Sequence, residues 1–449
     1  MKITQYITNE GLQFVARPVY PAADMSGALK LHETGREISR DFLGFGVAIT
    51  GSSCYNLSLM EPAERRALLE DIYGKDGIGL SIARLSVGAS DYSAELYSYD
   101  DVDGDVSLEH FSIDRDRDYI IPMIREILEI NPDLMLYASP WSPPGWMKTS
   151  GSICGGYMRA EFIECYADYI VRFIEEYEKC GIKISALTPQ NEPETQQHGQ
   201  MPACIWHPDI EAAYISVLRR KLDEHGYGDI RIWMYDYNFD NWVRVKWTLD
   251  NHPSLAEECD GVAFHYYRGG IEQIRALKAA YPQLGMHFTE GGPRLFDHYD
   301  NDWCKWGIMM SKTLNEGFAS FTGWNLMLDE TGGPNVGPYF CGGLVTRDSR
   351  NGALGYSGQY KVFRHISKFM QKGARVLELE ITDNVSGMFR FPKNEYPLQA
   401  TLIENPDGSR AYVLVNRDET KRQVQLEENG RLWYVEMLPN TISTVVVSE

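Results

Sequence analysis

The chain has 449 residues, and its 63 Asp and Glu against 43 Lys and Arg give a net charge of −20. This acidity disfavours nucleic acid and anionic lipid as partners, because both bind Lys and Arg, and it leaves neutral or cationic small molecules. With 43% apolar residues the chain can build a large core, and its length exceeds the roughly 250–300 residues of one core, so we expect more than one folded unit.

Residues 1–40 alternate apolar and polar positions without a helical pattern, so we expect strands there. Residues 1–10 lack the apolar segment of a signal peptide, and no run of about 18 apolar residues that would span a bilayer occurs in the chain. The eight cysteines are scattered without a CxxC pair, which is typical of reduced thiols. We therefore expect a cytoplasmic protein with no membrane insertion.

Eight short apolar runs follow, most of them bounded by Gly, Pro, Asn or Asp. They are too short for helices and are typical of buried strands. Amphipathic helical patterns lie between them, most clearly at Glu61–Tyr73 and Arg159–Cys180. The predicted strands are Phe42–Ala48, Ile78–Leu85, Leu134–Ala138, Ile182–Thr188, Ile230–Met234, Gly261–Tyr266, Gly285–Thr289 and Ala319–Leu326.

This alternation predicts an α/β fold, a closed (β/α)₈ TIM barrel across residues 41–371. An open, doubly wound sheet is the alternative that the pattern alone allows. The phosphate-binding loops GxGxxG and GxxxxGK[ST] do not follow any predicted strand. We therefore expect no nucleotide cofactor.

After residue 371 the chain changes to a β pattern. Candidate strands are Gln399–Ile403, Ala411–Val415 and Thr441–Val447, and turn residues such as those of Asn405–Gly408 separate them. We predict that residues 372–449 form an all-β sandwich domain beside the barrel. Strands from residues 1–40 are expected to join it, so that the barrel is inserted between two halves of the side domain.

Two predicted strands deliver a carboxylate to the same rim of the barrel. Glu192 follows the fourth strand, and Glu290 follows the seventh. Active sites of such barrels lie at the carboxyl ends of the strands, so the two glutamates are expected to face each other across one cavity. Paired carboxylates suit glycoside hydrolysis, in which one protonates the leaving oxygen and the other attacks or stabilises the sugar. The alternative is that each glutamate only caps or pairs at its strand end, and Glu194 is a rival to Glu192.

The other strand ends carry aromatic and short polar side chains. Sugars bind such surfaces, because their CH faces stack on rings and their hydroxyl groups form hydrogen bonds. Taken singly, each aromatic residue is as easily explained by core packing, and Arg84 by a buried ion pair. The residues at these ends are Arg84, Asp91, Trp141, Asn191, His265, Tyr267, Trp324 and Asn325.

Several motifs together resemble glycoside hydrolase family 30, which includes the glucosylceramidases. The resemblance runs in order from about residue 41 to residue 370. Two segments depart from the glucosylceramidase pattern: His265-Tyr266-Tyr267, where His-Trp-Tyr is usual, and residues 195–200. The matching motifs are Gly44–Thr50, Ala138–Lys148, Gln190–Glu194, Thr289–Gly292, Trp324–Leu326 and Gly332–Asn335.

The resemblance implies a retaining β-glycosidase on a (β/α)₈ barrel with a side β-sandwich. By position, Glu192 would be the acid/base and Glu290 the nucleophile. The subsite that holds the reacting sugar would be lined by Arg84, Asp91, Trp141, Asn191, His265, Tyr267, Trp324 and Asn325.

The expected function is therefore an exo-acting β-glucosidase of the glucosylceramidase type, acting on a small-molecule or oligosaccharide β-glycoside. The alternatives are a β-xylosidase, a β-fucosidase, a β-1,6-glucanase or galactanase, and, in a different class, a non-catalytic sugar-binding protein on the same scaffold. We expect no metal or cofactor, because no HExxH or His/Cys ligand spacing occurs. Asp101–Asp105 resembles the start of a calcium loop, but the sixth position is Val106 instead of Gly.

Overall fold

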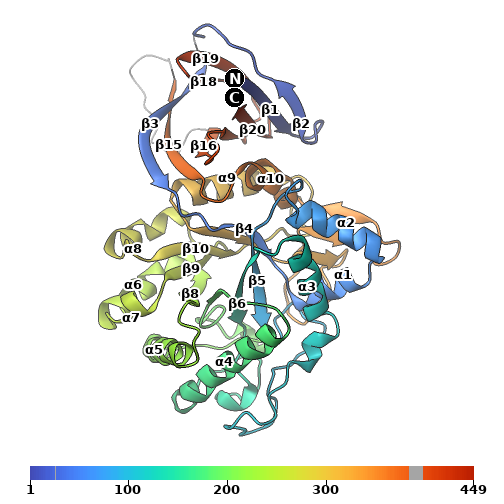
Figure 1. Ribbon diagram of the computed structural model, residues 1–449, viewed down its shortest axis with the longest axis vertical. Coiled ribbons are helices and arrows are strands. Elements are labelled where there is room, and N and C mark those ends of the chain that lie inside the picture. The colour runs from blue at the N-terminus through green and yellow to red at the C-terminus, as the bar shows by residue number, and fades with distance from the viewer. Residues whose placement is uncertain (26, 384–397, 449) are drawn as a thin grey trace.

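The computed structural model describes residues 1–25, 27–383 and 398–448. Within them, eight parallel strands close into a barrel (Figure 1), so the predicted TIM barrel is confirmed and the open-sheet alternative is wrong. Every strand overlaps a predicted run. In chain order the barrel strands are β4 (Gly44–Ala48), β5 (Ile82–Val87), β6 (Met135–Pro140), β7 (Ala186–Leu187), β8 (Arg231–Asn238), β9 (Gly261–His265), β10 (Gly285–Glu290) and β11 (Ser320–Gly323).

The barrel strands differ in length from their predicted runs, and β7 and β8 have a visible backbone reason. β7 covers only two residues. The next residue, Thr188, still donates its backbone N–H to Ala138 O at 3.0 Å. Pro189 has no N–H with which to continue this ladder of hydrogen bonds. β8 runs four residues further than predicted. Tyr235 and Asp236, with φ of 79° and 62°, form a bulge that carries the strand on to the rim.

Helices cover the outside of the barrel, and both predicted helices are confirmed. In α4 the apolar side chains at helical spacing, including Tyr166, Ile170 and Phe173, are buried against the strands. No described helix is long and apolar enough to cross a membrane. The helices are α1 (Gly51–Ser58), α2 (Pro62–Tyr73), α3 (Ile120–Ile130), α4 (Ile163–Lys179), α5 (Pro208–Glu224), α6 (Trp242–Asn251), α7 (Leu255–Glu258), α8 (Arg275–Ala280), α9 (Trp303–Asn315) and α10 (Gly358–Ile366).

The chain's two ends build the side domain together, as predicted. It differs from the expected sandwich because its strands, as far as the structure describes them, form one curled nine-stranded sheet with its own apolar core. Most pairs are antiparallel, whereas β18 and β3 are parallel. In sheet order the strands are β19 (Arg431–Met437), β18 (Arg422–Glu428), β3 (Leu29–Ser39), β15 (Arg375–Asp383), β16 (Leu398–Glu404), β17 (Arg410–Asn416), β20 (Thr441–Ser448), β1 (Lys2–Thr8) and β2 (Val15–Pro18).

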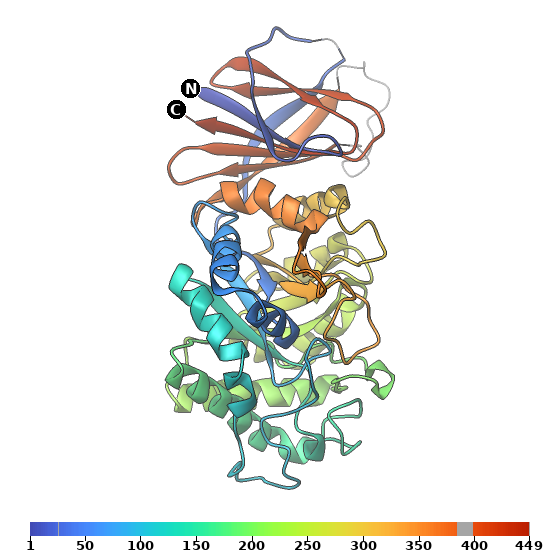
Figure 2. The same cartoon turned by 90° about the vertical axis from the view of Figure 1, so that its right-hand side faces the viewer.

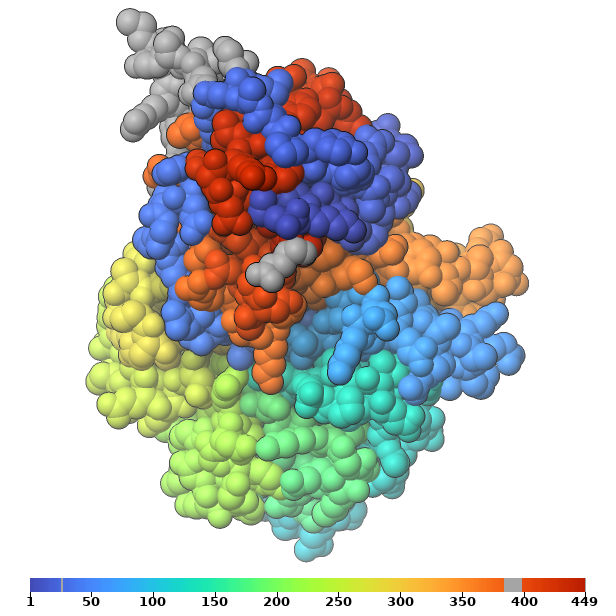
Figure 3. Space-filling view, turned by 45° about the horizontal axis from the view of Figure 1, so that its top comes forward, coloured from blue at the N-terminus to red at the C-terminus, as the bar shows by residue number. Residues whose placement is uncertain are grey.

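Helices α9 and α10 lie between the barrel and the curled sheet (Figure 2). The first and last strands, β1 and β20, pair along their length, so the two ends of the chain lie side by side on this domain (Figure 3). Trp303 of α9 donates its indole N–H to Asn440 O at 2.9 Å. A smaller sheet of β12 (Met327–Asp329), β13 (Val345–Arg347) and β14 (Leu354–Tyr356) follows the last barrel strand.

His365 of α10 is a buried polar link between the two domains. Its ring nitrogens lie 2.8 Å from Thr8 Oγ1 and 3.1 Å from Thr444 Oγ1. Burial, with a smaller effect of Arg364, lowers the pKa of His365 to about 3. The ring is therefore neutral in the folded protein at neutral pH.

This neutrality predicts a pH dependence of stability. The imidazole of His365 is protonated near pH 6.5 in the unfolded chain and only near pH 3 in the folded chain. The contribution of the neutral ring to the free energy of unfolding is therefore full above pH 6.5 and is lost as the pH falls from 6.5 towards 3. The expected slope is about 1.4 kcal/mol per pH unit. In urea unfolding, the stability advantage of the parent over His365→Gln should shrink by this slope between pH 6.5 and 4.5. An advantage independent of pH would contradict the prediction.

Candidate active site

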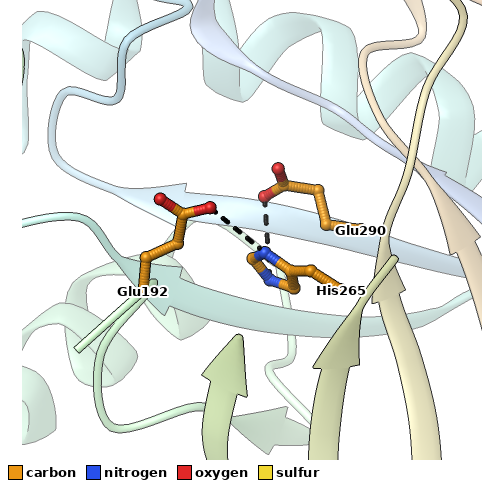
Figure 4. A group of neighbouring side chains, drawn as sticks. All are labelled: Glu192, His265 and Glu290. Atoms are coloured by element: carbon orange, nitrogen blue, oxygen red, sulfur yellow. Dashed lines mark ion pairs between the residues drawn. The ribbon is translucent and has the colours of Figure 1, made fainter. Parts of the chain in front are cut away.

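The two strand-end glutamates meet at the rim of the barrel, together with His265 (Figure 4). Glu290 ends β10, His265 ends β9, and Glu192 lies in the loop after β7. One carboxylate oxygen of each glutamate and a ring nitrogen of His265 all lie within 4.8 Å of one another. The structure therefore brings together the pair that the sequence placed on opposite sides of one cavity.

Local irregularities in the backbone aim these side chains. A shift of register between Phe288 and Glu290 sets Glu290 opposite His265 on the neighbouring strand. Bulges of this kind re-aim side chains beside active sites. Glu192 has a φ of 52°, in the left-handed region that non-glycine residues rarely occupy. Such conformations persist only where the surroundings hold them, and they cluster at functional sites.

Arg84, from β5, lies fully buried under the site and binds four partners. Its Nη1 donates to Glu290 Oε2 at 2.5 Å. Its Nη2 donates to Asp236 Oδ2 at 2.7 Å and to Asn191 Oδ1 at 2.8 Å, and its Nε donates to Ser139 Oγ at 3.0 Å. The guanidinium thus fixes Glu290 and occupies the side-chain oxygen of Asn191.

The buried charges beneath the cavity stabilise one another. Burial alone would raise the pKa of Asp236, but Arg84 and His265 hold it well below its usual range. Burial alone would lower the pKa of His265, but Glu290 and the hydrogen bond to Asp236 raise it to about 9. His265 Nε2 lies 3.0 Å from Asp236 Oδ1, so a charged imidazolium stands beside the glutamate pair at neutral pH.

Removing the guanidinium is expected to destabilise the barrel. Arg84→Met would leave the buried carboxylates of Asp236 and Glu290 without their main counter-charge, which costs about 3–5 kcal/mol in buried pairs. Urea unfolding measures this loss. The matched control is Arg220→Met on α5, whose ion pair with Glu164 is exposed, and we expect it to unfold like the parent. A loss under about 1 kcal/mol for Arg84→Met would contradict the prediction.

The two glutamates have different hydrogen-bond partners. Burial raises the pKa of Glu290; His265 and Arg84 oppose this rise, and the nearby Glu192 adds to it. Two carboxyl groups this close do not both ionise readily. Glu290 receives hydrogen bonds from Arg84 and, at 2.8 Å, from the hydroxyl group of Tyr267. These two donors favour the negative charge on Glu290.

The other predicted strand-end residues include stacked aromatic rings and unpaired polar atoms. Trp141 and Trp324 stack on each other at 5.2 Å between ring centroids, and Arg84 lies 4.7 Å above the ring of Trp141. Within the described residues, Asp91 Oδ1 and Asn325 Nδ2 are buried without hydrogen-bond partners. Buried polar atoms of this kind are normally satisfied, so both atoms are suited to the hydroxyl groups of a bound ligand.

The structure separates Glu194, the rival carboxylate, from the pair. Its oxygens bind Asn241 and the hydroxyl group of Tyr235, and Arg244 lies 3.7 Å away. In the calcium-like loop, Asp105 binds Ser107 and His110, and Asp101 binds Ser98. In the described part of the chain, the side chains grouped closely enough to hold a metal ion are those of Glu192, His265 and Glu290, where the charge of the imidazolium competes with a cation.

The sequence analysis missed several residues that support the pair. The hydroxyl groups of Thr188 and Thr289 both donate to Asp236, at 2.7 and 2.6 Å. Their place near the ends of β7 and β10 was visible in the sequence and could have suggested a role. Gln197 and Tyr339 also reach the site, through loops 142 residues apart. No spacing in the sequence indicates that those loops meet.

This arrangement can perform acid–base and nucleophilic chemistry on one bond. The carboxyl group of Glu290, held by Arg84, lies opposite that of Glu192, with one oxygen of each within 4.8 Å of the other. Retaining glycosidases place their two carboxyl groups about 5–5.5 Å apart, whereas inverting ones need about 6.5–9.5 Å for a water molecule. The short separation fits direct attack on a sugar held between the two groups.

The chain is similar to proteins of a known family. A family model for the glycosyl hydrolase family 30 TIM-barrel domain matches residues 42–370. An endo-1,6-β-D-glucanase of Neurospora crassa is 27% identical over 447 residues, covering 95% of this chain and 89% of that protein. The putative glucosylceramidase 4 of Caenorhabditis elegans is 27% identical over 410 residues, covering 84% and 75%. The crystal structure of SrfJ from Salmonella typhimurium has a TM-score of 0.91 at 26% identity, with both chains fully covered.

Proposed function

The chain belongs to glycosyl hydrolase family 30, and from this membership we propose that it hydrolyses a β-glucosidic bond with retention at the anomeric carbon. The observation that carries the proposal is the Glu192–Glu290 pair, with one oxygen of each carboxylate within 4.8 Å of the other. A decayed, non-catalytic scaffold has no reason to keep both groups with their buried partners. The family match and the geometry of the pair therefore support a working enzyme.

The proposed reaction proceeds by double displacement. Glu290 attacks the anomeric carbon and forms a glycosyl ester, while Glu192 gives its proton to the departing glycosidic oxygen. Glu192, now ionised, then takes a proton from water, and the resulting hydroxide equivalent attacks the ester and releases Glu290. Each displacement inverts the anomeric carbon, so the product keeps the β configuration.

The remaining cavity residues are proposed to bind the reacting sugar. Asp91 Oδ1 and Asn325 Nδ2 are free to bind its hydroxyl groups, and Asn191 presents its amide N–H₂ because Arg84 occupies its oxygen. Arg84 and Tyr267 both donate to Glu290, and these hydrogen bonds favour the ionised carboxylate that attacks.

We propose glucose as the reacting sugar and exo action on short β-glucosides as the first candidate activity. The names of both relatives specify a glucosyl unit, as an endo-1,6-β-D-glucanase and a putative glucosylceramidase. The second candidate is cleavage within β-1,6-glucan. It is favoured by the wider match to the glucanase, which covers 95% of this chain against 84% for the glucosylceramidase.

A panel of substrates tests the proposal. The purified protein is assayed on aryl β-glucoside, β-xyloside, β-fucoside and β-galactoside, and then on β-1,6-gluco-oligosaccharides of increasing length. We expect the aryl β-glucoside to react fastest and early NMR spectra to show β-glucose first. Rates that rise steeply with oligosaccharide length favour the endo-glucanase, and a faster xyloside or fucoside would replace glucose as the sugar. Activity on none of them, with the fold intact, would favour a sugar-binding protein.

A further inference from the structure

Gln197 touches the glutamate proposed as acid/base. It lies five residues after Glu192, in the loop between β7 and α5, and its side chain is buried, whereas its neighbours Gln196 and His198 are exposed. Its amide Nε2 donates to Glu192 Oε2 at 2.5 Å. The amide group of Gln197 therefore contacts one of the two carboxyl oxygens of Glu192, Oε2.

A second loop fixes the orientation of this amide. The hydroxyl group of Tyr339, between β12 and β13, donates to Gln197 Oε1 at 2.6 Å. With this hydroxyl donor on Oε1, the N–H₂ end of the amide faces Glu192. Tyr339 is itself anchored, since its backbone oxygen accepts the hydroxyl group of the fully buried Tyr92 at 3.0 Å.

These contacts determine which oxygen of Glu192 carries the proton. An amide N–H occupies Oε2, so a proton on Glu192 is held on the other oxygen, Oε1. In Figure 4, Oε1 is the oxygen joined by a dashed line to His265, whose Nδ1 lies 3.4 Å away, and it faces Glu290. The glycosidic oxygen of a substrate must lie in this space between the two carboxyl groups.

The backbone of this loop is unusual in the same region. Glu192, Gln197 and His198 have φ values of 52°, 48° and 52°, all in the left-handed region. Residues with side chains adopt such angles only where other contacts hold them. The segment with these angles is the one that places the side chain of Gln197 against Glu192.

We propose that Gln197, oriented by Tyr339, is a positioning residue for proton donation by Glu192. By binding Oε2 it keeps the transferable proton on Oε1, directed at the leaving oxygen. The inference rests on the proposed function and assigns to this chain's own loop, residues 195–200, a part in the acid step.

The test exploits leaving groups that differ in their need for an acid. The value of kcat/KM reports bond cleavage, and 2,4-dinitrophenolate leaves without a proton whereas phenolate needs one. Gln197→Met keeps the length of the side chain but lacks the N–H. We expect kcat/KM to fall about 10–100-fold on phenyl β-glucoside and to stay within about twofold of the parent on dinitrophenyl β-glucoside. Tyr339→Phe, which removes only one hydroxyl group at the surface, should give a smaller loss of the same pattern.

Gln196→Met is the matched control, because Gln196 lies next to Gln197 but is exposed, and its rates should equal those of the parent on both substrates. An equal loss by Gln197→Met on the two substrates would show a general structural or binding role and overturn the inference, as would no loss on either. Those results leave the parent active and the proposed function standing. A parent inactive on every aryl glycoside would overturn the proposed function, and this inference with it.

Discussion

Glu290→Gln is expected to lower kcat on an aryl β-glucoside by at least about 10⁴-fold, because it removes the carboxylate proposed to form the glycosyl ester. The amide is nearly the same size; its one oxygen can still accept from Arg84, and its N–H₂ end can donate to the hydroxyl oxygen of Tyr267. Binding of a glucose-like inhibitor should therefore change little, which titration calorimetry measures. The loss should appear equally with good and poor leaving groups, because the nucleophile is needed for both.

Two further variants sharpen this prediction. Glu194→Gln is the matched control, because Glu194 stands two residues after Glu192 but binds Asn241 and Tyr235, and it should keep near-parental activity. Glu290→Ala opens space for azide at the attacked face. Direct attack by azide is a single displacement, so it should yield the α-glucosyl azide. Turnover near the parental rate by Glu290→Gln would show that the nucleophile is misassigned.

The barrel was predictable because most of its strands carry two signals in the sequence, a short apolar run and Gly, Pro, Asn or Asp residues that bound it. The run at Gly285–Thr289, for example, is apolar and begins and ends near glycines, and it became β10 almost unchanged. The side domain was predictable only in part. Strands in which apolar and polar residues alternate indicate a sheet. They do not show whether two sheets stack or one sheet curls, because that depends on which strands pair. The parallel contact between β3 and β18 joins residues about 395 positions apart and has no local signal.

The site divides in the same way. Glu192, Glu290 and Arg84 were predictable because strand ends of a barrel converge, and this rule needs only the strand order. The network of charges that joins Arg84, Asp236 and His265 was not predictable. The position of Asp236 depends on a bulge in β8 at Tyr235, and the residue types around Tyr235 do not reveal that bulge. The contact of Gln197 with Tyr339 depends on the paths of two loops, which the rule does not describe. Strand-borne groups are therefore easier to predict than the loop-borne groups that tune them.

Glu192→Gln is expected to affect activity in a way that depends on the leaving group. On phenyl β-glucoside, kcat/KM should fall about 10²–10⁴-fold, because the departing oxygen receives no proton. On dinitrophenyl β-glucoside, kcat/KM should stay near the parental value, since attack by Glu290 needs no acid there. Hydrolysis of the glycosyl ester then becomes slow, because no base activates water. Rapid-mixing kinetics should therefore show a burst of dinitrophenolate equal to the enzyme concentration.

Azide distinguishes this role from that of the nucleophile. It needs no general base, so it should accelerate turnover of dinitrophenyl β-glucoside by Glu192→Gln while leaving the parent unchanged. Two displacements, by Glu290 and then by azide, make the product the β-glucosyl azide. An α-glucosyl azide from this variant would mean that Glu192 is the nucleophile, against the two hydrogen bonds that Glu290 receives from Arg84 and Tyr267. The configuration of one product therefore assigns the roles of the pair.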